Sequence, residues 1–297
     1  MAPPERARIG RAEGRALASL FLLTLIWGLS IPAMKLGLAD MPPAALVTLR
    51  YLVAAPVFAL LLRRWPRPRP RALAVMAALG LFGVDLGQYA QMAGVARCPA
   101  SVATIITAVI PVLTVVLVAL RLGQRLRPVH GAGFALALAG VALAVWQGGA
   151  AATPRALGGE ALVGLSTLCI AGYYAFGAEV AAREGALPTA AWSTIFAALG
   201  LLATALVTQP RGAWQLDPRV ILVALYLGLL VTVAGMLIWL RALATVPARI
   251  AGATQYGQPL VGIAASAALF GDPLGPRFLL GTALVLGGVA LSALRGR

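Results

Sequence analysis

The chain has 297 residues, of which 61 % are hydrophobic and only 11 % are charged, and its mean hydropathy is +0.90. A water-soluble domain carries about 25 % charged residues, so this composition excludes an ordinary soluble protein and favours a chain that lies in lipid. The net charge of +15 does not indicate nucleic-acid binding, because nearly all the basic residues are arginines gathered between apolar segments, where they signal membrane topology.

In lipid, only helices and closed barrels satisfy the hydrogen bonds of the backbone. The apolar runs are about 20 residues long and do not alternate with polar residues, which favours helices over barrel strands. The sequence therefore predicts an all-α integral membrane protein with ten transmembrane helices. We place them at residues 16–36, 44–63, 71–94, 99–120, 128–147, 158–181, 188–208, 218–241, 247–269 and 276–294.

The basic residues of the connections predict the orientation. If the N-terminus is cytoplasmic, 17 basic residues lie at cytoplasmic ends and six at outer ends, with Arg50 inside a span. Positive residues concentrate on the cytoplasmic side of membrane proteins, so both termini are predicted to be cytoplasmic. The arginine-rich N-terminus resembles a signal peptide, but its apolar run is too long and is read as a retained helix.

The chain nearly repeats itself with a shift of 148 residues. From Pro99 to Trp146, 16 of 48 positions are identical to those 148 residues later, without a gap. Because each half holds five helices, an odd number, the second half enters the membrane from the other side. The sequence predicts two inverted five-helix repeats, residues 1–150 and 151–297, around a central cavity that holds the substrate.

Helix three carries the first group of candidate binding residues. Asp85, Gln88 and Tyr89 follow i, i+3, i+4 spacing and therefore share one face of the helix. Polar groups within a membrane span are costly and tend to line a cavity, so this face is expected to meet the substrate. In the alternative interpretation, Asp85 pairs with Arg50 or a neighbouring helix and only fixes the packing.

Helices four and nine carry a second group. Thr107 and Gln255 are repeat mates, and each lies four residues before a proline, Pro111 or Pro259, that is expected to bend its helix. An inverted two-fold axis would place the two side chains across the midplane, with Gln258 beside Gln255. The alternative for Thr107 is a hydrogen bond to its own helix, which is common for threonine.

Two tryptophans within spans, Trp27 and Trp239, could face the cavity and stack on a flat substrate, or they could be packing residues. The candidate site is mildly polar and aromatic and has no cluster of cations that would suit a phosphate. A zwitterion would fit it, with Arg50 and the amides on a carboxylate and Asp85 on an amine.

Short motifs in the first four helices now allow a comparison with known families. They are Trp27-Gly28 with Lys35, Leu49-Arg50-Tyr51 with Ala54, and Pro99-Ala100-Ser101-Val102-Ala103 with Pro111. Together with their partial recurrence in the second half, they resemble the drug/metabolite transporter superfamily, specifically its ten-helix EamA type. That family often has Gly-Glu after helices four and nine. Here these sites read Gly123-Gln124 and Gly271-Asp272, so an acidic role is expected only in the second half.

The resemblance extends to exporters of amino acids, including the YddG-type exporters of aromatic amino acids. It implies a secondary transporter of the bacterial inner membrane, functional as a monomer, that exports large neutral or aromatic amino acids and related metabolites by alternating access. The alternative is a broad exporter of drugs or lipophilic metabolites. A channel is disfavoured because an internally duplicated chain needs no subunits to form a path.

No enzyme activity, cofactor or metal is expected. The chain has one histidine and nine scattered acids, which do not suit metal or acid–base chemistry. It also lacks a phosphate-binding loop, so it does not hydrolyse ATP itself. The expected partners are a small-molecule substrate and the lipid bilayer, with no nucleic acid.

Overall fold

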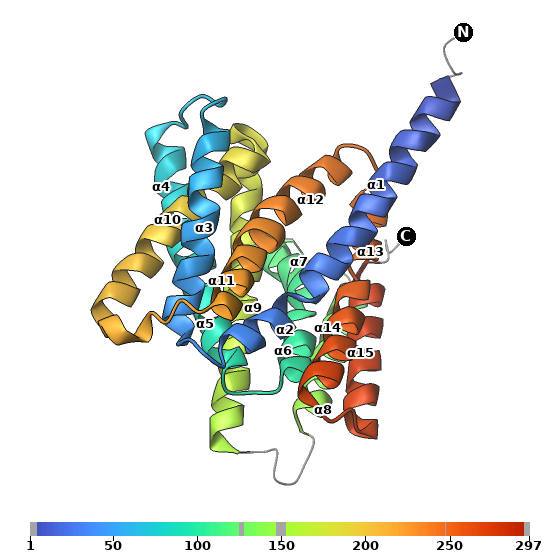
Figure 1. The fold of residues 1–297 in the computed structure, drawn as a ribbon. Helices are drawn as coiled ribbons and strands as arrows, with labels where there is room; N and C mark the ends of the chain where they lie inside the picture. Colours follow the sequence, from blue (N-terminus) through green and yellow to red (C-terminus); the bar gives the residue numbers. More distant parts are fainter. Residues whose placement is uncertain (1–4, 125–127, 147–152, 247, 294–297) are drawn as a thin grey trace.

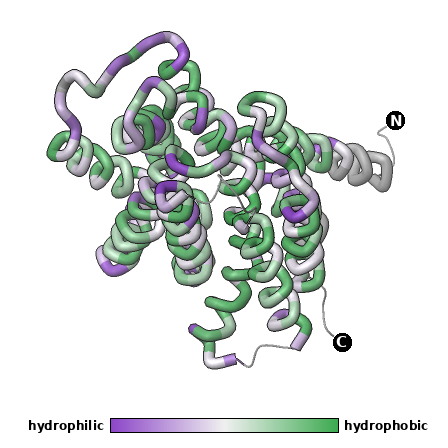
Figure 2. The backbone as a smooth tube through the Cα atoms, turned by 90° about the horizontal axis from the view of Figure 1, so that it is seen from below, coloured by the Kyte–Doolittle hydropathy of each residue, from purple (hydrophilic) through white to green (hydrophobic). Residues whose placement is uncertain are grey.

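The fold is described from a computed structural model, which covers residues 5–124, 128–146, 153–246 and 248–293. The predicted division at residues 150 and 151 and the predicted helix ends at 147, 247 and 294 lie outside these residues. Within them, nine helical segments are long and apolar enough to cross a membrane. Hydrophobic residues dominate the helices, and hydrophilic residues gather in the connections (Figure 2). The predicted all-α membrane fold is confirmed.

The first half of the chain forms five spans, several of which are interrupted (Figure 1). They are α1 (Glu5–Gly28) with α2 (Ser30–Gly37), α3 (Pro43–Leu62), α4 (Pro70–Ala78) with the π-helical η1 (Leu79–Asp85) and α5 (Leu86–Val95), α6 (Ala100–Thr107) with α7 (Ile110–Arg121), and α8 (Pro128–Val145).

The second half repeats this order. Its elements are α9 (Pro154–Glu184), α10 (Ala186–Thr208), the short 3₁₀ turn η3 (Arg211–Ala213), α11 (Pro218–Leu225) with the π-helical η4 (Tyr226–Ala234) and α12 (Gly235–Leu243), α13 (Ala248–Thr254) with α14 (Gly257–Phe270), and α15 (Pro276–Ala293). The pair α13 and α14 is the predicted ninth helix, divided in two.

The expected effect of the two repeat-mate prolines is confirmed. The fourth span breaks at residues 108–109, directly before Pro111, which is the second residue of α7. The ninth span breaks at residues 255–256, before Pro259, the third residue of α14. A proline in a helix removes a backbone donor and clashes with the preceding turn, so each helix restarts just before the ring.

A second pair of irregularities was not predicted from the sequence. Both the third and the eighth spans contain a π-helical segment, η1 and η4. Adding 148 to the bounds of η1 gives 227–233, which lies within η4. π-Helical turns are rare and often lie at functional sites, so their recurrence at repeat-related positions points to the middle of these two spans.

The two halves meet at a crossing of α8 and α15 that depends on glycine. A Cβ added to Gly140 would lie 2.6 Å from the carbonyl oxygen of Gly281, and one added to Gly133 would lie 2.7 Å from that of Gly288. Gly133 and Gly281 are repeat mates, as are Gly140 and Gly288. The two contacts therefore exchange when the halves are exchanged. Gly133, the earlier glycine of α8, meets Gly288, the later glycine of α15, and Gly140 meets Gly281. The two helices therefore run antiparallel, as an inverted repeat requires.

The crossing can be tested by adding one methyl group. Gly281→Ala would place its Cβ 2.6 Å from the Gly140 oxygen and 2.7 Å from the Ala144 nitrogen, so the backbones must separate. We expect a loss of about 1–3 kcal/mol of stability, typical of overpacking, measured as a lower melting temperature of the detergent-solubilised protein. The control is Gly287→Ala, whose nearest neighbour would be a Leu136 methyl group at 3.8 Å. Equal melting temperatures for the two variants would contradict this role of the glycine crossing.

Candidate functional site

Arg50 lies in the interior, where three spans meet. Its side chain extends from α3, and the residue is only 6 % exposed. Its Nε donates a hydrogen bond to Thr232 Oγ1 at 3.0 Å, and its Nη1 donates one to Gln88 Oε1 at 2.7 Å. Arg50 thus connects the second, third and eighth spans, and through Thr232 it joins the two halves of the chain.

The π-helical segment η4 presents the acceptor for Arg50. The hydroxyl of Thr232 donates to the Leu227 carbonyl oxygen, five residues back, at 2.8 Å. This orients the lone pairs of Thr232 Oγ1 toward the guanidinium. A buried charge without hydrogen-bond partners is very costly, so the position of Thr232 in the π turn is important for keeping Arg50 within the bundle.

Asp85 is the last residue of η1 and lies one helical turn before Gln88. Its carboxylate packs against Gly200 of α10, where any Cβ would collide with Oδ2. Among the described residues, no ion pair or side-chain hydrogen bond joins Asp85 to Arg50. No described contact supports the alternative that Asp85 pairs with Arg50, whereas its packing against Gly200 fits the other part of that alternative, in which Asp85 fixes the packing against a neighbouring helix.

Tyr51 lies beside Arg50, and two further tyrosines lie near Tyr51. Arg50 Cζ lies 5.4 Å from the centre of the Tyr51 ring, and Tyr51 is also within electrostatic range of Asp85. The rings of Tyr173 and Tyr174 in α9 pack edge to face, 5.4 Å apart, and both residues lie near Tyr51. We call Arg50, Gln88, Thr232, Asp85 and the three tyrosines the Arg50 cluster.

The predicted tryptophans lie together. The rings of Trp27 and Trp239 are 6.0 Å apart, inclined at 46°. Trp27 Nε1 donates to the carbonyl oxygen of Val231 at 2.9 Å, and the hydroxyl of Tyr226 donates to the carbonyl oxygen of Ile26 at 2.6 Å. These two bonds join α1 to η4, so the Trp27 indole has a packing role in this conformation.

Gln255 and Gln258 form a second polar group where α13 and α14 meet. Gln258 Nε2 donates to Gln255 Oε1, and Gln255 Nε2 donates to Thr254 Oγ1 at 3.1 Å. Thr24 of α1 donates to the carbonyl oxygen of Thr254 at 3.0 Å, which ties the break to the first span. The two amides therefore bond each other at the proline break rather than joining the Arg50 cluster by a described hydrogen bond.

Two predicted residues lie apart from these contacts. The hydroxyl of Thr107 donates to the carbonyl oxygens of Ala103 and Thr104 in its own helix, as the simpler interpretation of Thr107 expected. Tyr89 is 37 % exposed and takes part in no described contact with Asp85 or Gln88. Thr232 was not predicted from the sequence, because no local motif indicates its role. The proximity of Tyr51 to Tyr173 and Tyr174 was not predicted either.

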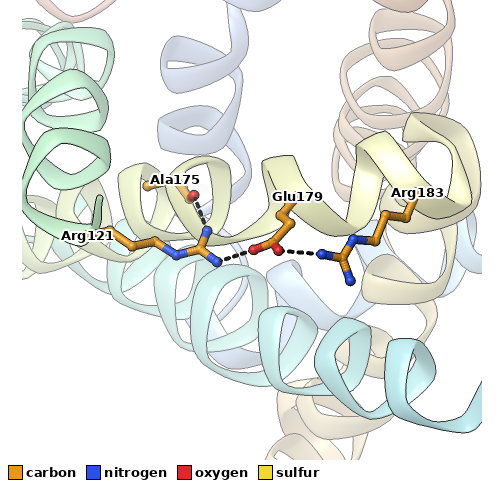
Figure 3. A network of polar contacts seen from close by, with 4 residues as sticks. All are labelled: Arg121, Ala175, Glu179 and Arg183. Atoms are coloured by element: carbon orange, nitrogen blue, oxygen red, sulfur yellow. Dashed lines mark hydrogen bonds and ion pairs between the residues drawn. The ribbon is translucent and has the colours of Figure 1, made fainter. Parts of the chain in front are cut away.

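A separate ionic network lies at the end of the bundle that the loop charges predict to be cytoplasmic (Figure 3). Arg121 of α7 forms an ion pair with Glu179 of α9 at 2.6 Å and donates to the Ala175 carbonyl oxygen at 3.0 Å, and Arg183 pairs with the other oxygen of Glu179 at 2.8 Å. Half of the Glu179 side chain is exposed, so this network holds α7 against α9 near the surface. Among the described residues, no three histidine, cysteine or acidic side chains group to hold a metal ion.

The comparisons with known proteins define the class. The chain belongs to the EamA-like transporter family, whose model matches twice, over residues 14–146 and 157–294. It is a multi-pass membrane transporter.

Similar proteins cover nearly the whole chain. A probable terminal-alkyne amino-acid exporter of Streptantibioticus cattleyicolor is 29 % identical over 282 residues, 93 % of each protein. A probable amino-acid metabolite efflux pump of Salmonella typhimurium is 26 % identical over 288 residues, 91 % of this chain and 92 % of that protein. A solved crystal structure with 21 % identity superposes with a TM-score of 0.66 over 94 % of this chain and 98 % of that one, which shows the fold alone.

The role of Thr232 can be tested by removing its hydroxyl. Thr232→Val keeps the side-chain shape but leaves Arg50 Nε without its described partner. We expect a loss of about 1–3 kcal/mol, seen as a lower melting temperature in detergent, together with impaired transport. Thr208→Val is the control, since Thr208 is exposed and bonds only to its own helix and to the amide of neighbouring Gln209. Unchanged stability and transport for Thr232→Val would show that Arg50 does not depend on this bond.

Proposed function

We propose that this protein is a secondary transporter that exports large neutral and aromatic amino acids and related metabolites. The observation that carries the proposal is that the buried guanidinium of Arg50 bonds Gln88, while Asp85, an acid without a described ion pair, lies one helical turn before Gln88. The described hydrogen bonds of Arg50 use Nε and Nη1. Its Nη2 has no partner among the described residues. A carboxylate is the natural ligand for such a free edge of a guanidinium.

Asp85 supplies the opposite charge for a zwitterion. It lies on the third span, one turn from Gln88, and it faces no cation in the described contacts. An ammonium group would satisfy it. A substrate that carries both charges therefore neutralises the two protein groups that are most costly to keep in lipid, whereas a simple anion or cation would neutralise only one.

The tyrosines account for the expected side chain of the substrate. Tyr51 lies beside Arg50, Tyr173 and Tyr174 form a further pair of rings in α9, and aromatic rings prefer offset or edge-to-face packing with other rings. Trp27 and Trp239 form a separate aromatic pair between the first and eighth spans. A large neutral or aromatic side chain matches this surface better than a charged or strongly polar one.

The names of similar proteins support the same class of substrate, since two of them are described as amino-acid exporters or efflux pumps. We further propose that the transporter works as a monomer in the bacterial inner membrane, with both termini in the cytoplasm. Transport is expected to proceed by alternating access, as the two inverted halves rearrange about the shared two-fold axis.

A broad exporter of lipophilic cations remains the second candidate. The specific observation in its favour is Asp85, which has no described ion pair and lies near Tyr51, because cations are attracted to ring faces and to an unpaired acid. The two candidates differ in what they require of the substrate: only the amino-acid exporter needs Arg50 to bind a carboxylate.

The first test is counterflow of radiolabelled amino acids into liposomes that hold the purified protein, with and without a pH gradient. We expect saturable exchange of large neutral or aromatic amino acids. Exchange of lipophilic cations without any amino acid would support the second candidate and refute the first.

The two charged residues can be separated with substrate analogues. Asp85→Asn is expected to weaken competition by phenylalanine at least tenfold, but to leave competition by 3-phenylpropionate, which lacks the amine, unchanged. Arg50→Lys is expected to weaken competition by phenylalanine while sparing phenethylamine, which lacks the carboxylate. Competition assays in the same liposomes measure both. If both variants compete as the parent protein does, the zwitterion assignment is wrong.

A further inference from the structure

The connection between α5 and α6 is held from both sides by charged residues of other spans. Lys35 of α2 donates from Nζ to the carbonyl oxygens of Val95 and Cys98, at 2.8 Å each. Asp272, between α14 and α15, accepts a hydrogen bond from the backbone N–H of Ser101 at 2.8 Å. A cation thus meets the carbonyl end of α5, and an anion meets the amide end of α6.

Both contacts have the favourable sign for a helix end. Carbonyl groups at the end of a helix attract cations, and amides at its start attract anions. Each bond is charge-assisted, and such bonds are stronger than those between neutral groups. Lys35 and Asp272 also lie within electrostatic range of each other. The bond from Ser101 to Asp272 joins the first half of the chain to the second.

The same end of the bundle brings the fourth and ninth spans into close contact. A Cβ added to Gly262 of α14 would lie 2.8 Å from the Thr104 methyl carbon of α6, and the residue Thr104 is only 5 % exposed. Separation of α6 from α14 at this end would also break the bond between Ser101 and Asp272.

The opposite end of the bundle has no acid at the position related to Asp272 by the repeat; Glu179 lies at that end in its ion pair with Arg121. Gly123 and Gly271 are repeat mates with similar left-handed backbone, at φ values of 61° and 67°, so the helices before them end in the same way. The residue that follows is Asp272 in the second half and Gln124 in the first. Gln124 is exposed and uncharged. The repeat mate of Ser101 is Arg249 in α13. The opposite end therefore has the neutral amide of Gln124 at the position where this end has the carboxylate of Asp272.

We propose that Asp272, with Lys35, forms a latch that keeps this end of the transporter closed and biases the resting protein toward the state open at the opposite end. The loop charges predict that the latched end faces the outside. The resting protein would then accept its substrate from the cytoplasm, as an exporter must. The proposal rests on the alternating access of the proposed function, and it adds the residue that sets which access state is preferred.

The latch can be tested by the accessibility of reporter cysteines. The two native cysteines are replaced by alanine. Cys98 binds Lys35 through its carbonyl oxygen, so the replacement keeps that bond, and burial already raises the pKa of its thiol to about 12. Thr104→Cys reports opening of the latched end, and Gly252→Cys, its repeat mate, reports the opposite end. Gly252 has no neighbour within 4 Å of an added Cβ.

Labelling rates with a membrane-impermeant maleimide are compared in intact cells for Thr104→Cys and in inverted vesicles for Gly252→Cys. Asp272→Asn is expected to raise the labelling rate of Thr104→Cys by about tenfold, because a charge-assisted bond between the halves becomes a neutral one, and to lower that of Gly252→Cys. The control is Asp217→Asn. Asp217 also accepts a bond from a helix N-terminus, Val220 N–H at 2.8 Å, but both residues lie at the start of α11 within one half. Asp217→Asn should leave both labelling rates unchanged.

Gln124→Glu gives an independent test with Asp272 intact. It adds the missing acid to the opposite end and is expected to slow labelling of Gly252→Cys. Unchanged labelling in both Asp272→Asn and Gln124→Glu would overturn the latch. Because labelling requires no substrate, that outcome would leave the proposed function standing. Failure of amino-acid counterflow by the parent protein would refute the proposed function without affecting the labelling result.

Discussion

The structure depends on keeping one arginine within a bundle of apolar helices. Arg50 is nearly fully buried, and in lipid its charge must be satisfied by protein groups. Gln88 and Thr232 provide the described bonds, and each lies in or beside a π-helical segment, η1 or η4. The irregular backbone of the third and eighth spans therefore lies where these spans bring polar groups to the buried Arg50. The same arrangement leaves Nη2 of the guanidinium without a partner among the described residues.

The second constraint is the inverted symmetry of the two halves. It appears in the antiparallel glycine crossing of α8 and α15, in the paired proline breaks, and in the paired π-helical segments. The symmetry is incomplete where the charged residues lie. Asp85 corresponds to Val233, and Asp272 corresponds to Gln124. In the transport cycle that we propose, the symmetric scaffold provides two related access states, and these asymmetric charges give the two ends different strengths of closure.

Much of the fold could be predicted because lipid imposes strong rules on sequence. Apolar runs of about 20 residues defined the spans, and Pro111 and Pro259 defined the breaks. The contacts of the site were harder to predict because they join residues far apart in the chain, such as Arg50 and Thr232. The polar character of Asp85 and Gln88 was visible in the sequence, but the π turns that position their neighbours were not. Thr107 shows the opposite case, since a polar residue at a suggestive position bonds to its own helix.

The most direct test of the central claim is an experimental structure of the protein with a bound aromatic amino acid. The account predicts that the substrate carboxylate lies on the guanidinium of Arg50, that its amine faces Asp85, and that its ring packs among Tyr51, Tyr173 and Tyr174. A bound amino acid elsewhere in the bundle, with Arg50 still joined only to Gln88 and Thr232, would contradict the account.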